Sequence, residues 1–299
     1  MSESTINRCG YCAIVGRPNV GKSTLLNRLV GQKLAITSRK PQTTRHSILG
    51  VKSVSGGQMI FVDTPGIHQR GEQPMNRYLN RTAKTVLDDV DLLLFVVEAG
   101  VWTDEDQAVL EALARARPPA ILVINKVDRI KEKGRLLPFI QEVSEKGGFT
   151  DVIPVSAEQG DNSQRLEALV LSHMPEGENF FPQEQLTDRP ERFFAAELLR
   201  EQLTRRYAKE IPYALTVEIE RFQQEGGLYR INALVWVERE GQKNIIIGRQ
   251  GAALKEVARQ ARKEMERFFD KRVFLTVWVK VKKSWSSDEG ALARLGYGD

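Results

Sequence analysis

From Tyr11 to Met174, short apolar, β-branched runs alternate with longer stretches. In most of these stretches apolar residues recur at spacings of three and four, the period of an amphipathic helix. This alternation predicts a doubly wound, mostly parallel six-stranded α/β sheet. The turn Ser55-Gly56-Gly57 is too short to hold a helix, so we expect an antiparallel hairpin at the sheet edge. The expected strands cover residues 12–15, 48–54, 59–62, 92–97, 120–124 and 152–155.

The pattern changes beyond residue 175. Proline, glycine and polar residues are frequent in 176–190, which predicts a linker. After it we expect a helix over 191–207, two strands joined by the Gly226-Gly227 turn, further helical residues and a last strand from Val273. Apolar and polar positions alternate along these strands, which predicts a smaller α+β domain whose sheet has one covered face. Trp236 and Trp278 fall on the strands, and we expect both to pack there. The expected division is 9–175, the linker 176–190, 191–284 and a C-terminal tail 285–299.

Length and composition fit two such domains. The chain has 299 residues, of which 41% are hydrophobic, enough apolar material for a core in each domain. The longest apolar run, residues 92–97, is far shorter than a membrane span, and the N-terminus lacks a secretory signal pattern. The only cysteines, Cys9 and Cys12, have no second ligand pair nearby and suit a reducing compartment. We therefore expect a cytoplasmic protein.

Positive charge is concentrated toward the C-terminal end. The net charge is only +5, but residues 243–283 hold twelve lysines and arginines against four acidic residues. A basic block this local suggests a polyanionic partner. Charge alone leaves open the alternative of a solvated helix face.

A phosphate-binding loop is the strongest local signal. Residues 16–23 spell G-R-P-N-V-G-K-S, which matches G-x-x-x-x-G-K-[ST] between an expected strand and an expected helix. The glycines let backbone N–H groups face phosphate oxygens at the helix N-terminus. We expect Lys22 to neutralise the β- and γ-phosphates and Ser23 to hold Mg²⁺. The candidate residues of this loop are Gly16, Arg17, Pro18, Asn19, Val20, Gly21, Lys22, Ser23 and Thr24.

Two further motifs stand at strand ends, where ligands of open α/β sheets bind. Asp63-Thr64-Pro65-Gly66 follows an apolar run, so Asp63 can reach the Mg²⁺ shell and the Gly66 N–H can approach the γ-phosphate. Asn125-Lys126-Val127-Asp128 follows another apolar run. The Asp128 carboxylate can accept from the ring N–H and the exocyclic amine of guanine, whereas adenine would leave it unpaired. We expect Asn125 to brace the neighbouring loop, Lys126 to lie along the base, and Ser156-Ala157 to offer a backbone N–H to the guanine oxygen.

The second domain contains a G-x-x-G sequence, Gly248-Arg249-Gln250-Gly251. The spacing alone is common, but here it follows three isoleucines and precedes an amphipathic helix with basic residues on its polar side. A helix–GxxG–helix turn brings backbone N–H groups and a basic side chain against a sugar-phosphate backbone, as in KH domains that bind single-stranded RNA. The element order resembles the type II KH domain. The candidate RNA-binding residues are Ile247, Gly248, Arg249, Gln250, Gly251 and Lys255.

The nucleotide motifs, in this order, resemble those of translation-factor-related P-loop GTPases. The segments G-R-P-N-V-G-K-S, P-Q-T-T-R, D-T-P-G-I-H and N-K-V-D, together with the second domain, resemble more closely the Era family of KH-domain GTPases within the TrmE-Era-EngA-like class. The resemblance covers about residues 12–285. It implies a Mg²⁺-dependent GTPase with a low intrinsic rate that cycles between GTP and GDP.

The resemblance also implies roles for single residues. Thr44 matches the switch-I threonine that joins Mg²⁺ better than Thr43 does, so the implied metal ligands are Ser23, Thr44 and Asp63, and the implied catalytic groups are Lys22, Thr44 and Gly66. Asn19 occupies the position at which related enzymes are thought to recruit K⁺; stabilising the loop is the alternative role. Ile67 stands where Ras-like enzymes carry the glutamine that positions water, and isoleucine cannot hydrogen-bond water.

The implied partner is single-stranded ribosomal RNA, namely the 3′ end of 16S rRNA on the small ribosomal subunit. The implied role is 16S rRNA processing and 30S subunit biogenesis by a monomer. The second hypothesis is a GTP-gated protein- or membrane-binding switch whose basic face contacts acidic lipid instead of RNA. Such a protein would be peripheral on the cytoplasmic face of the inner membrane. A metabolic P-loop kinase is the third, and the Asn-Lys-Val-Asp motif disfavours it.

Overall fold

The computed structural model describes residues 7–38, 40, 43–64, 75, 87, 89–208, 210–288, 290 and 292. These residues divide into two compact units. The first contains the chain through Ala35 and, from Thr44, most of the described residues as far as Asp188. The second contains everything from Arg189 and also includes the short segment 36–43. The boundary after Asp188 lies within the segment 176–190 that was expected to be a linker.

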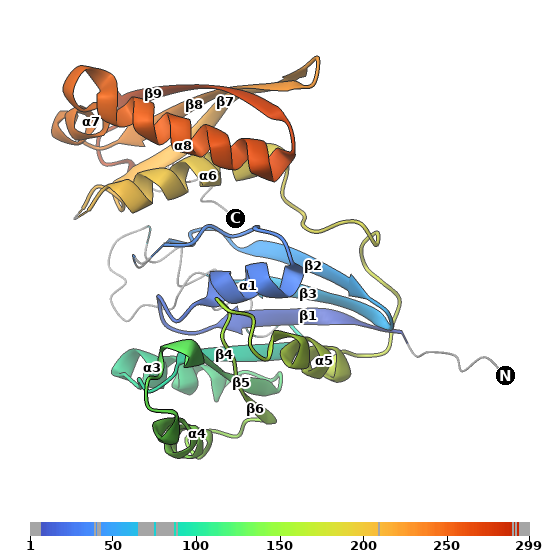
Figure 1. Ribbon diagram of the computed structural model, residues 1–299. Helices are drawn as coiled ribbons and strands as arrows, with labels where there is room; N and C mark the ends of the chain where they lie inside the picture. The colour runs from blue at the N-terminus through green and yellow to red at the C-terminus, as the bar shows by residue number, and fades with distance from the viewer. Residues whose placement is uncertain are drawn as a thin grey trace. The chain divides into compact units, whose positions relative to one another are not determined.

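The first unit contains a six-stranded sheet in the order β2-β3-β1-β4-β5-β6 (Figure 1). Every neighbouring pair is parallel except β2 and β3, which are antiparallel and joined through Gly56. The doubly wound, mostly parallel sheet and its edge hairpin are therefore confirmed. The strands are β1 Arg8–Val15, β2 Ile48–Val54, β3 Gly57–Asp63, β4 Leu92–Glu98, β5 Ala120–Asn125 and β6 Asp151–Pro154.

Helices cover both faces of this sheet, which explains why its central strands are apolar throughout. All residues of β3, and all of β4 except the last, are buried. Helices α1 and α5 contact β1 and β3, while buried side chains of α3 and α4 join a core cluster with β4 and β5. The helices are α1 Lys22–Val30, α3 Asp104–Leu113, α4 Leu136–Ser144 and α5 Ser163–His173, with 3₁₀ turns at Val127–Arg129 and Lys133–Arg135.

The second unit has a three-stranded sheet in the order β7-β8-β9, with β7 antiparallel and β9 parallel to β8. Helix α6 contacts β7, and α7 and α8 contact β9. The order helix–strand–strand–helix–helix–strand confirms the expected arrangement. The elements are α6 Glu191–Arg206, β7 Leu215–Glu225, β8 Leu228–Val237, α7 Glu240–Ile247, α8 Ala252–Phe269 and β9 Arg272–Val281, with 3₁₀ turns at Arg249–Gly251 and Trp285–Ser287.

One expectation for this sheet is wrong. Trp278 does not pack in the core, because 59% of its surface is exposed, and Phe274 on the same face of β9 is 53% exposed. Trp236 of β8 is half-buried; its Nε1 donates to Glu218 at 2.8 Å, and the Lys282 ammonium lies over its ring. The alternation predicted one covered face correctly, but it did not tell which side chains lie on the other.

No helix among the described residues is long and apolar enough to cross a membrane. Both thiols, Cys9 and Cys12, are free and buried in β1.

Candidate functional site

The phosphate-binding loop joins β1 directly to α1. Gly16 and Gly21 adopt positive φ angles of 152° and 104°. A side chain at Gly21 would meet the Asn125 amide at 2.3 Å, so only glycine fits between the two loops. The buried Lys22 ammonium donates to the carbonyl oxygens of Gly16 at 2.8 Å and Arg17 at 3.0 Å. Burial lowers the pKa of Lys22 to about 8, although the nearby Asp63 carboxylate opposes that shift.

Three oxygen-bearing side chains from separate segments meet beside this loop. The Ser23 hydroxyl donates to Asp63 Oδ2 at 2.8 Å and lies 2.7 Å from Thr44 Oγ1. Thr44 Oγ1 is 3.4 Å from the same carboxylate oxygen. Thr43 is directed elsewhere, since its hydroxyl donates to the Lys40 carbonyl at 2.7 Å. The geometry therefore groups Thr44, and not Thr43, with the other two expected metal ligands.

This oxygen cluster fits a small hard cation. Asp63 is fully buried, and its Oδ1 has no hydrogen-bond partner among the described residues. Burial raises the pKa of Asp63 to about 6, against the opposing effects of Lys22, Ser23 and Thr44. A buried carboxylate oxygen with a free lone pair, next to two hydroxyls, is the donor set that Mg²⁺ accepts alongside phosphate oxygens and water. Thr64, next in the chain, points away and donates to the Ile14 carbonyl at 2.9 Å.

The base-recognition residues lie at the ends of β5 and β6. The Asn125 side chain bridges loops, donating to the Val20 carbonyl at 2.8 Å and accepting from the Ala157 N–H at 3.0 Å. The Asp128 carboxylate is exposed at this edge, and the Ser156 hydroxyl donates to its Oδ1 at 2.5 Å. Asn125 thus braces the loops as expected, and Ser156 fixes the orientation of the carboxylate.

Two acidic residues outside the motifs, Glu98 and Asp106, pair with Arg17 of the phosphate loop, and Glu98 also pairs with Lys126 of the base loop. Glu98, the last residue of β4, accepts from Lys126 Nζ at 2.8 Å and lies 3.5 Å from the Arg17 guanidinium. Asp106 accepts from Arg17 Nε at 2.9 Å and closes the capping box of α3 with Thr103. Glu98 stands at a strand end, a signal that was present in the sequence, whereas the ion pair with Asp106 depends on tertiary placement.

Two expected nucleotide-site residues, Pro65 and Gly66, lie outside the described residues, as does Ile67. The remaining loop positions form the turn between β1 and α1: Asn19 has a positive φ of 66°, and Thr24 lies in the first helical turn.

The G-x-x-G sequence forms a tight turn between α7 and α8. Gly248 has φ 71° and ψ 179°, and a side chain there would meet Ala253 Cβ at 2.5 Å. Gln250 adopts a left-handed conformation, with φ 52° and ψ 27°. The side chains of Arg249, Gln250 and Lys255 are exposed, while Ile247 is half-buried. The turn therefore presents its basic and amide groups to solvent, with glycines where the backbone is most crowded or twisted.

A P-loop, a hydroxyl–carboxylate cluster and a guanine-type base loop at one sheet edge define a guanine-nucleotide-binding protein. Family models agree. The model described as 50S ribosome-binding GTPase matches residues 11–126, and the model described as KH domain matches residues 210–286.

Comparison with full-length relatives shows to which family of GTPases the chain belongs. The chain is 55% identical to the GTPase Era of Pseudomonas fluorescens strain Pf-5 and 54% identical to that of Pseudomonas putida strain W619, over 100% of each chain. Two solved Era structures match with TM-scores of 0.94 at 37% identity, covering 98% of this chain and 100% of theirs. One is a Tyr-to-Ala variant from Aquifex aeolicus bound to GDP and AlF4⁻; the other is Era with MgGDPNP and nucleotides 1506–1542 of 16S ribosomal RNA. The chain belongs to the Era family of GTPases. It is a GTPase with a C-terminal KH domain, and the predicted resemblance is confirmed.

Proposed function

We propose that this GTPase is a nucleotide-controlled RNA-binding factor that acts on the 3′ end of 16S rRNA in its processing and in 30S subunit biogenesis. The main support is that one chain contains both an assembled nucleotide site and a KH domain. In that domain Arg249 of the G-x-x-G turn and Lys255 of the following helix are exposed. A relative with the same two domains has been solved with nucleotides 1506–1542 of 16S ribosomal RNA, which supports the choice of RNA.

In this proposal Ser23, Thr44 and Asp63 hold Mg²⁺, which would neutralise charge on the β- and γ-phosphates. Lys22 exchanges the loop carbonyls that it now contacts for phosphate oxygens. The role proposed for Gly66, which lies outside the described residues, is to donate its N–H to the γ-phosphate. Asp128 reads the guanine base. The Ser156 N–H donates to the Asp161 carbonyl at 3.1 Å and the Ala157 N–H donates to Asn125 at 3.0 Å, so one of them would have to leave that partner to donate to the guanine oxygen.

The RNA assignment is tested by comparing polyanions at one ionic strength. With a non-hydrolysable GTP analogue, the full chain should retain a single-stranded 16S 3′-end fragment on a filter and should not co-sediment with phosphatidylglycerol vesicles. Because one family model is described as 50S ribosome-binding, 30S and 50S subunits should be compared, and preference for 30S is expected. Tighter binding to vesicles than to RNA would replace the proposal with a membrane-binding switch.

Hydrolysis should be slow and should increase when K⁺ replaces Na⁺. Ile67 supplies no hydrogen bond to water, so we propose that a cation recruited by Asn19 contributes charge stabilisation instead. Asn19 has a positive φ of 66°, so Asn19→Gly removes the amide without straining the turn. The variant should hydrolyse GTP equally slowly in both salts. Equal rates in K⁺ and Na⁺ for the parent protein would remove the cation from the mechanism.

A further inference from the structure

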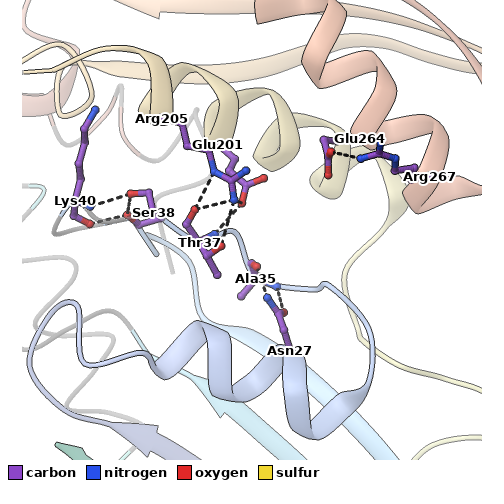
Figure 2. Close-up of polar contacts among 10 residues, drawn as sticks. Asn27, Ala35, Thr37, Ser38, Lys40, Glu201, Arg205, Glu264 and Arg267 are labelled. Atoms are coloured by element: carbon purple, nitrogen blue, oxygen red, sulfur yellow. Dashed lines mark hydrogen bonds and ion pairs between the residues drawn. The ribbon is translucent and has the colours of Figure 1, made fainter. Parts of the chain in front are cut away.

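The chain between α1 and β2 is fixed to the nucleotide-binding unit at both ends. At the first end the Asn27 side chain accepts from the N–H groups of Leu34 and Ala35 at 2.8 Å and donates to the Ala35 carbonyl at 2.7 Å. Figure 2 shows this contact where the segment leaves α1. At the other end Thr44 lies beside Ser23 and Asp63. Both anchors belong to the first unit.

The segment between these anchors, residues 36–43, belongs by its contacts to the second unit. Arg200 of α6 donates from Nη2 to the Thr43 carbonyl at 2.6 Å. The same guanidinium is held by both carboxylate oxygens of Glu197, at 2.7 and 2.6 Å, and both side chains are buried. A buried, bidentate ion pair has a fixed direction, so the N–H that reaches Thr43 is rigidly placed.

Further contacts hold the rest of the segment to the same helix (Figure 2). The Thr37 N–H donates to Glu201 Oε1 at 2.9 Å, and Arg205 donates to that oxygen at 2.8 Å and to the Thr37 carbonyl at 3.2 Å. The Lys40 ammonium donates to the Thr204 carbonyl at the end of α6. One helix therefore contacts the segment near its beginning, middle and end.

We infer that α6 positions Thr44 for GTP hydrolysis through this segment, and that Arg200, Glu201 and Arg205 are positioning residues of the nucleotide site. Thr43 and Thr44 share a peptide bond, so a displacement of the held carbonyl moves the Thr44 hydroxyl with it. That hydroxyl lies 2.7 Å from Ser23 Oγ, among the proposed Mg²⁺ ligands. The inference rests on the proposed role of Thr44. Under this inference, the rate of hydrolysis depends on three residues that lie outside every nucleotide-binding motif.

The test loosens the segment without touching the buried ion pair. Arg205 is 46% exposed at its side chain and Lys40 is half-buried, so the double variant Lys40→Met with Arg205→Gln should fold. Its kcat should fall about tenfold, since small misplacement of a catalytic group costs one to two orders of magnitude. The Mg²⁺ concentration for half-maximal rate should rise. GDP affinity should stay within about twofold, because binding relies on the phosphate and base loops.

A matched control lies on α8. Arg267 pairs with Glu264 at 2.7 Å, an exposed contact on its own helix (Figure 2). Lys263, one turn earlier on the same helix, is also exposed. Lys263→Met with Arg267→Gln removes the same two charges and should leave kcat unchanged. A rate equal to or above the parent's in the Lys40→Met, Arg205→Gln variant would overturn the inference. An equal loss of GDP affinity would also overturn it, because that loss indicates general destabilisation of the site.

Thr44→Ala separates this inference from the function on which it rests. Normal hydrolysis by Thr44→Ala would refute the role of Thr44, and the inference would fall with it. Slow hydrolysis by Thr44→Ala together with normal hydrolysis by the Lys40→Met, Arg205→Gln variant would leave the nucleotide site as proposed and refute only the positioning by α6.

Discussion

Asp128→Asn should shift the nucleotide preference from guanine to xanthine by about 3 kcal/mol, or more than a hundredfold in relative affinity. The carboxylate accepts from two donors of guanine, and the Asn amide would place its own donor against one of them. Xanthine carries an oxygen where guanine has its amine, so the amide can donate to it. Ser156 holds Asp128 Oδ1 at 2.5 Å, which keeps the group aimed as the charge is removed.

Competition between GTP and xanthosine triphosphate for the full chain measures this shift. Asp151→Asn is the control, because Asp151 begins β6 whereas the base loop lies beyond the end of that strand. The control should bind both nucleotides as the parent does. If Asp128→Asn keeps the parent's preference for GTP, the assignment of the base-reading residue is wrong.

The sequence predicted most of the nucleotide site because each motif follows an apolar run. Strands that are buried on both faces are recognisable by composition, and in a parallel sheet their C-terminal ends meet at one edge. The positions of Lys22, Asp63 and Asn125 in the structure follow from this rule. The G-x-x-G turn was recognisable for a similar reason, since helical periodicity on its flanks placed it between two helices.

Other features depend on contacts between residues far apart in the chain, which local pattern does not encode. Glu98 and Asp106 meet Arg17 only after β4 and α3 are placed beside the phosphate loop. The Arg200 contact with Thr43 joins positions 157 residues apart. Trp278 was expected to pack because it falls on a strand, but alternation alone does not tell whether a bulky residue lies on the covered or the open face, and this one is exposed.

RNA binding should depend on the turn between Gly248 and Gly251 rather than on total positive charge. Arg249→Asp with Gln250→Asp places carboxylates where phosphates must lie and keeps both glycines, which matters because a side chain at Gly248 would meet Ala253. Aspartate tolerates the left-handed conformation of Gln250, so the turn should persist. Affinity should fall about thirtyfold or more, since one hydrogen bond to a charged group contributes about 2 kcal/mol.

Two further measurements show whether the turn variant loses only RNA contacts at the turn or is damaged more generally. The GTP affinity of the turn variant should equal the parent's, because the phosphate and base loops belong to the first unit. Each lost phosphate contact should reduce the slope of log affinity against log salt by about 0.7, the value for single strands. Lys282→Asp with Lys283→Asp changes the net charge by a larger amount but lies beyond β9, away from the turn in sequence.

The most direct test of whether RNA binding depends on the KH turn is therefore one titration of a single-stranded 16S 3′-end fragment. It uses three full-length proteins, each loaded with the same GTP analogue. The parent and the Lys282→Asp, Lys283→Asp variant should bind with affinities within about threefold of each other, about 0.7 kcal/mol apart at most. The Arg249→Asp, Gln250→Asp variant should bind at least about thirtyfold more weakly. Equal binding by the turn variant and the parent would contradict the central claim that this turn holds the RNA.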